Sequence, residues 1–127
     1  MVAVLDAPPH VVAVRVEGSA TQADADEAAV DAALDAAGPV SGVYVEVGWV
    51  WGDADGEFED RIRQGFGRLA ERPHVRRVAF VAGSYPRRSA LRHEAARVDD
   101  VEIEVFPTAA TAEALAWAAE AGPADAG

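Results

Sequence analysis

Short valine-rich runs alternate with helix-forming segments along the whole chain, and this alternation constrains the fold more than any other feature. Each run has the length of a β-strand, and most either alternate apolar with polar residues or are apolar throughout. The predicted strands are Val2–Leu5, Val11–Glu17, Val43–Val47, Arg77–Ala82 and Val101–Phe106. Arg77–Ala82 is nearly all apolar and is expected inside the sheet. Val101–Phe106 alternates with glutamates and is expected at an edge.

Helix signals fill the segments between and after these strands. The first predicted helix stops at Gly38, the second ends before Pro73, the third begins near Pro86, and the last follows Pro107 and ends near Gly122. The order ββαβαβαβα predicts a single α/β domain with a mixed, mostly parallel five-stranded sheet and helices on its faces. We assign residues 1–122 to this domain and 123–127 to a flexible tail.

The charge balance favours a salt-adapted protein. The chain has 22 acidic and 11 basic residues, a net charge of −11, and every basic residue is arginine. An acidic surface stays soluble when salt screens its charges, whereas at low ionic strength the same charges repel one another. A high-GC genome is the alternative explanation, because it also removes lysine, but it does not account for the net charge.

Composition also limits compartment and chemistry. The chain has no cysteine, so disulfides and thiolate chemistry are excluded. Its apolar runs are too short to span a membrane, and the first residues lack the pattern of a secretion signal. We therefore expect a cytoplasmic protein with no transmembrane segment and no cofactor.

Positive charge is concentrated in one part of the chain. Residues 61–97 contain ten of the eleven arginines and only two acidic residues, a formal charge of +8, which leaves −19 for the rest. Binding of an anionic partner through this segment is therefore one alternative function. The acidic remainder opposes association with a phosphate backbone, so nucleic acid is not expected as a partner.

Four stretches of sequence together suggest a family. They are Val4-Leu5-Asp6 continuing through Pro9 to Gly18, Thr21 to Asp24 at the first helix, Tyr44-Val-Glu-Val47, and Phe106-Pro107 followed by Glu113-Ala-Leu-Ala-Trp117. This succession resembles the SpoIIAA-like family over nearly the whole length. The resemblance implies a STAS-type fold, also compared with CRAL-TRIO lipid-binding domains, and a non-catalytic binding or regulatory module. Residues 46–53 contain no serine or threonine, so the phosphorylation switch of related STAS proteins is not carried over.

The loops after the third and fourth predicted strands are the best candidate site, because ligands of open α/β sheets bind beyond the carboxyl ends of the strands. The candidate ligand-binding residues are Trp49, Trp51, Phe58, Gly83, Ser84, Arg87 and Arg88. The aromatic residues would hold a small apolar or amphipathic ligand or a protein partner, and the arginine-rich helix start would hold an anionic group. Alternatively, the aromatic residues close the core and the arginines pair with the chain's own acids. A homodimer is a further open alternative.

Signals for catalysis and metal binding are weak. Ser84 and His93 with a nearby carboxylate define an alternative, a hydrolase-like enzyme. The sequence from Gly65 to Ala70 matches G-x-G-x-x-A but is expected late in a helix, where the pattern does not indicate a nucleotide site. The three histidines lack the spacing of zinc ligands. No catalytic or metal-binding residue is assigned.

Overall fold

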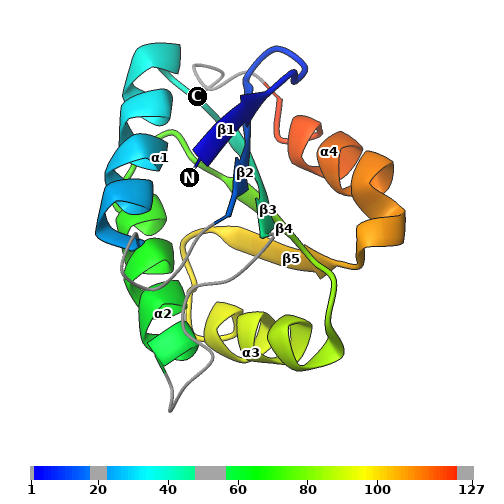
Figure 1. Cartoon of the computed structure of the whole chain (residues 1–127). Coiled ribbons are helices and arrows are strands. Elements are labelled where there is room, and N and C mark those ends of the chain that lie inside the picture. The colour runs from blue at the N-terminus through cyan, green and yellow to red at the C-terminus, as the bar shows by residue number, and fades with distance from the viewer. Residues whose placement is uncertain (1, 18–22, 48–56, 123–127) are drawn as a thin grey trace.

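The computed structural model describes residues 2–17, 23–47 and 57–122 (Figure 1). Its elements, in chain order, are β1 (Val2–Leu5), β2 (Val11–Val16), α1 (Ala23–Ala37), β3 (Gly42–Val47), α2 (Glu57–Ala70), β4 (Arg77–Ala82), α3 (Tyr85–Ala95), β5 (Glu102–Phe106), a short 3-10 turn η2 (Thr108–Ala110) and α4 (Thr111–Ala119). The predicted α/β fold class and element order are confirmed. Three strand ends differ from the predicted ones by one residue: β2 ends at Val16, β3 begins at Gly42 and β5 begins at Glu102. Thr21 and the tail 123–127 lie outside the described residues.

The five strands lie in the sheet in the order of the sequence, β1-β2-β3-β4-β5. β1 is antiparallel to β2, and the other neighbouring pairs are parallel. Because every parallel crossover steps in the same direction and such crossovers are right-handed, α1, α2 and α3 fall on one face of the sheet. α4 covers the other face (Figure 1). β4 lies inside the sheet and β5 at an edge, as predicted.

Side-chain size differs between the two faces of the sheet. The three-helix face is built from larger apolar residues, chiefly Val14, Val43, Val45, Val78 and Phe80, which pack against α1, α2 and α3. The α4 face combines Val11, Tyr44 and Val81 with the small residues Ala13, Gly42 and Ala79, which lie beneath Ala114 and Ala118 of α4. Small residues on both sides let α4 approach the sheet closely.

Gly42 marks the closest approach of α4 to the sheet. A Cβ added at Gly42 would lie 2.4 Å from the main-chain oxygen of Ala118. Beside this contact, the Arg77 guanidinium donates to the main-chain oxygen of Trp117 at 2.9 Å and to the Glu120 carboxylate at 3.1 Å. The same guanidinium lies 4.8 Å from the centroid of the Trp117 ring, a cation–π contact. Gly42 and Arg77 therefore fix the position of α4.

Candidate functional site

A mostly apolar pocket lies between α1, α2 and the three-helix face of the sheet, and it encloses about 70 Å³. Its apolar side chains come from six elements: Val16, Val30, Val45, Val47, Ile62, Phe66, Leu69, Phe80 and Leu91. Val16 and Val47 are the last residues of β2 and β3. The pocket is therefore at the carboxyl end of the parallel strands, where open α/β sheets usually bind ligands.

Gly65 on α2 leaves one side of this pocket open. It is the pocket residue without a side chain, and a Cβ built there would meet no atom within 4 Å. A glycine within a helix costs roughly 1 kcal/mol relative to alanine, so this opening is obtained at the expense of helix stability. Gly67, two residues further on, is also surrounded by open space, but it does not line the pocket.

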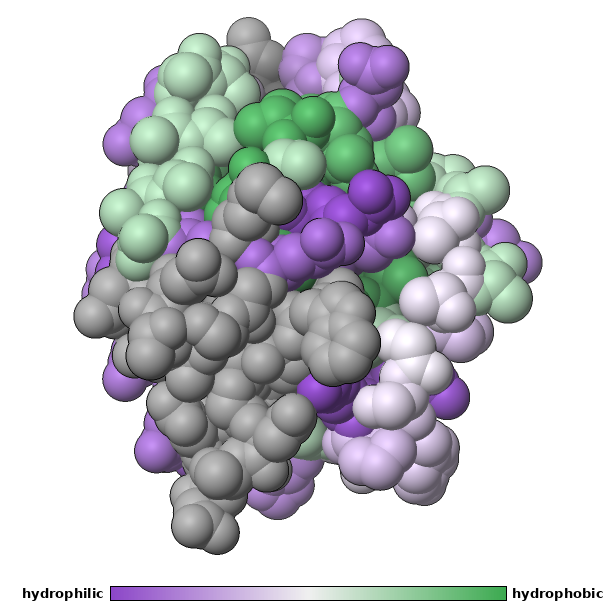
Figure 2. Space-filling view, viewed as in Figure 1, coloured by the Kyte–Doolittle hydropathy of each residue, from purple (hydrophilic) through white to green (hydrophobic). Residues whose placement is uncertain are grey.

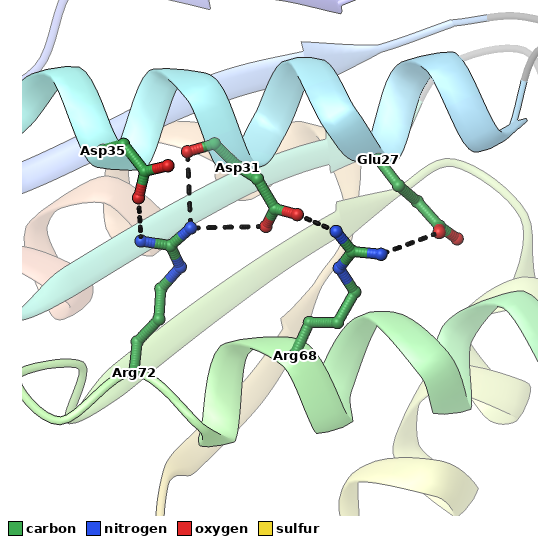
Figure 3. Close-up of polar contacts among 5 residues, drawn as sticks. All are labelled: Glu27, Asp31, Asp35, Arg68 and Arg72. Atoms are coloured by element: carbon green, nitrogen blue, oxygen red, sulfur yellow. Dashed lines mark hydrogen bonds and ion pairs between the residues drawn. The ribbon is translucent and has the colours of Figure 1, made fainter.

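A row of ion pairs joins α1 to α2 at the pocket (Figure 3). We call this row, formed by Glu27, Asp31 and Asp35 of α1 with Arg68 and Arg72, the α1–α2 ladder. Arg68 pairs with Glu27 at 3.6 Å and with Asp31, and Arg72 pairs with Asp31 at 3.4 Å and Asp35 at 2.9 Å. The acids recur every four residues and so face one side of α1.

The ladder gives the apolar pocket a charged rim. Glu27, Asp31 and Arg68 belong to the ladder and also line the pocket. Partly exposed pairs of this kind contribute roughly 0–1 kcal/mol each, so their main effect is to place α1 and α2 relative to one another. The resulting site combines a hydrocarbon interior with guanidinium and carboxylate groups at its edge.

A separate ion pair joins α2 to α3. The Glu94 side chain is only 3% exposed, and its two carboxylate oxygens accept from Nε and Nη2 of Arg63 at 3.2 and 3.1 Å. The hydrogen bonds from Arg63 lower the pKa of Glu94 below its ordinary value, although burial acts in the opposite direction. This pair holds α2 and α3 together, and the Glu94 carboxylate is already bonded to Arg63 of the same chain.

The opposite face of the sheet has a second hollow beside α4. It is lined by Leu5, Leu115 and a polar group of three residues, Arg15, Tyr44 and Glu46. The Tyr44 hydroxyl donates to Glu46 at 3.3 Å, and Arg15 lies 3.5 Å from the same carboxylate. Burial, together with the Glu46 charge, raises the pKa of Tyr44 to about 12. These groups satisfy one another, so we interpret the hollow as a structural feature of the sheet.

The fold pairs several arginines of the arginine-rich segment with the chain's own carboxylates. At least four of its arginines form salt bridges with carboxylates that lie 25 or more residues away in the sequence. Arg68 and Arg72 bind the acids of α1, and Arg77 binds Glu102 and Glu120. This arrangement reduces the positive charge that residues 61–97 can offer to an anionic partner. The pairing of Arg87 and Arg88 with the chain's own acids stays a prediction.

The predicted site residues fall into two groups. Trp49 and Trp51 lie outside the described residues, and Phe58 lies in the first turn of α2 with its side chain outside the described part. Ser84 is the N-cap of α3, where its hydroxyl accepts from the main-chain N–H of Arg87 at 3.4 Å. Arg88 donates to the main-chain oxygen of Ala82 at 3.0 Å. Gly83 is exposed beside them.

The structure separates the two residues of the hydrolase-like alternative. Ser84 caps the start of α3, and His93 lies in its last turn. Nine helical residues correspond to about 13 Å along the axis, far beyond hydrogen-bond distance. The proposed Ser84–His93 pair is therefore wrong, because a helix holds the two side chains apart. Across residues 2–17, 23–47 and 57–122, no group of three His, Asp or Glu side chains is placed to hold a metal ion.

Comparison with known families identifies the fold. The model of the SpoIIAA-like family matches residues 11–119. The chain belongs to the SpoIIAA-like family. The match begins at the first residue of β2 and ends at the last residue of α4, so it contains the whole parallel part of the sheet. Membership in this STAS-related family indicates a binding or regulatory module.

The other comparisons add no relative. Neither the curated proteins nor the solved structures gave a match. Within the described residues, no helix combines the length and the apolar character needed to cross a membrane.

The pocket residues of α2 have a sequence pattern that indicates packing against the sheet, not a cavity. Ile62, Phe66 and Leu69 have the spacing of a helix face packed on a sheet. The one available signal for a cavity was Gly65, which interrupts this apolar face without starting a turn. The candidate loop after β4 contributes no residue to the pocket lining.

Proposed function

We propose that this SpoIIAA-like chain is a non-catalytic binding module whose pocket between α1 and α2 takes the hydrocarbon part of a small apolar or amphipathic ligand. The observation that carries the proposal is the apolar pocket at the carboxyl ends of β2 and β3, with charged groups at its rim. Protein interiors are usually closely packed, so a cavity at this position is more consistent with a ligand than with packing alone.

The size of the pocket limits the ligand. A cavity of about 70 Å³ is roughly half the 150 Å³ that accommodates benzene in an engineered apolar cavity. A short or branched hydrocarbon end fits this space better than a ring system or a long chain. The polar end of the ligand would lie at the rim, beside Arg68 and Asp31.

The test uses short four-carbon probes, 1-butanol and butanoate, titrated into the full chain and followed by amide chemical shifts. We expect the largest changes at Val45, Val47 and Leu91, which line the pocket from different elements. Binding of butanol without binding of butanoate would assign the affinity to the hydrocarbon alone. If neither probe shifts these signals at millimolar concentration, the proposal is wrong.

Two glycines on α2 provide a matched pair of variants. Gly65→Leu places a side chain at the pocket, whereas Gly67→Leu adds the same side chain to the same helix at a position that does not line it. We expect Gly65→Leu to weaken probe binding by about tenfold or more and Gly67→Leu to leave it unchanged. Equal affinities in the two variants would place the ligand elsewhere. If a protein binds the wild-type chain at α2 and neither probe binds there, the alternative of a protein partner is favoured.

A further inference from the structure

Among the described residues, β1 forms an open edge of the sheet. In the part of the chain that the structure describes, β1 pairs with β2 and no strand lies on its other side. An open edge presents unpaired N–H and C=O groups, and proteins usually protect it with charged residues, proline or a covering element. β5, at the opposite edge, has Glu102 and Glu104 exposed. β1 has no charged residue and no proline, and its Val4 is 68% exposed.

The exposed surface of α1 beside β1 is also uncharged. α1 contacts β1. Among the described side chains of α1, the exposed ones are Asp35 of the α1–α2 ladder and the alanines Ala25, Ala28, Ala29, Ala32, Ala36 and Ala37. Four of them, at spacings of four, three and four residues, form one stripe along the helix. This stripe is turned away from the α1–α2 ladder, because the ladder acids occupy a different side of the helix. Figure 2 shows the result, a continuous hydrophobic surface over α1 and β1.

We propose that this surface is the interface of a homodimer in which β1 pairs antiparallel with β1 of a second copy. Antiparallel pairing of a strand with its own copy has the two-fold symmetry of most protein dimers. It would satisfy the open backbone groups of both edges and join two five-stranded sheets into one. The alanine stripes would lie on the same side of the joined sheet, where small side chains allow two helices to approach closely.

The charge of the chain identifies a second copy as the occupant. Each copy carries −11, so two copies repel one another except where the surface lacks charge. The α1–β1 surface meets this condition. A partner selected by charge would instead be basic and would bind the acidic parts of the surface. The dimer is therefore stabilised by salt, because the screening length falls from about 10 Å at 0.1 M to about 3 Å at 1 M.

Sedimentation equilibrium of the full chain tests the proposal. We expect the mass to rise with concentration from 13.3 kDa towards twice that value, and to do so at lower concentration in about 1 M salt than in about 0.1 M salt. Hydrogen exchange of the β1 amides should slow as the dimer forms, which distinguishes this interface from others. A chain that stays monomeric at millimolar concentration in high salt would overturn the proposal.

Charged variants locate the interface. Val4→Asp and Ala29→Glu place carboxylates on β1 and on the α1 stripe, and each should raise the dimer dissociation constant by about tenfold or more. Ala116→Glu adds the same charge to an exposed position of α4 and should leave the constant unchanged. Circular dichroism verifies that each variant is folded, and if Val4→Asp is not, Ala29→Glu decides. If both variants are folded and dimerise with the dissociation constant of wild type, the dimer interface lies on another surface.

Discussion

Replacing Gly42 with alanine should loosen α4 from the sheet. The new Cβ would lie 2.4 Å from the main-chain oxygen and 3.0 Å from the carbonyl carbon of Ala118. β3 is paired on both sides and cannot move away, so α4 must shift outward by about 1 Å to reach ordinary contact distance. Overpacking of this kind costs about 1–3 kcal/mol, and weakening the hydrogen bond from Arg77 to Trp117 costs about 1 kcal/mol more. Alanine also lowers the conformational entropy of the unfolded chain, which stabilises the folded state by about 0.4–1 kcal/mol.

The net loss should be about 2–3 kcal/mol, which corresponds to a melting temperature lower by roughly 6–12 °C. The change in the free energy of unfolding is measured by urea unfolding in concentrated salt, followed by circular dichroism. Gly67→Ala is the matched control, because its Cβ meets open space and alanine favours the helix, so that variant should be about 0.5–1 kcal/mol more stable than wild type. If Gly42→Ala is as stable as wild type, α4 is not held at the distance described.

Three further results are expected. Arg63 lowers the pKa of Glu94 in the folded state, so the stability that this pair contributes is complete above about pH 4.5 and is lost as the pH falls through the lowered pKa. The urea midpoint of Glu94→Gln should therefore change less on acidification than the urea midpoint of wild type. The Tyr85→Phe variant leaves Tyr44 as the one tyrosine, and its ultraviolet titration should give a midpoint near 12. Adding Glu46→Gln should lower this midpoint, and an unchanged midpoint would contradict the role of Glu46. Removal of salt by dialysis should reduce the folded signal in circular dichroism because of the −11 net charge, and a salt-indifferent spectrum would contradict salt adaptation.

The fold could be predicted because its elements are encoded locally. Arg77–Ala82 was expected as an interior strand and has the same bounds in β4, since a strand covered on both faces must be apolar throughout. The start of α3 near Pro86 was also expected, and the structure identifies Ser84 as its N-cap. The close approach of α4 was not predicted, because it depends on Gly42 and Ala118 being brought together from distant parts of the chain.

The candidate site was harder to predict, because it depends on distances between elements. Helical spacing shows that Phe66 faces the core, but not whether the space beside it is filled. The ladder pairs Asp31 with Arg68, 37 residues away, and only the placement of α1 against α2 brings them together. The aromatic loop of Trp49 and Trp51 remains a prediction, since both residues lie outside the described part of the chain.

The sequential strand order also has a consequence for synthesis on the ribosome. Each strand of the sheet pairs with the strand made just before it, so the sheet can grow from the N-terminus without waiting for a later strand to insert. The face of the sheet opposite α1, α2 and α3 is covered later, because α4, which covers it, is the last element to be synthesised. Nascent chains that end before α4 would therefore carry Ala13, Tyr44 and Val81 uncovered, and they would need protection from aggregation until Thr111–Ala119 emerges.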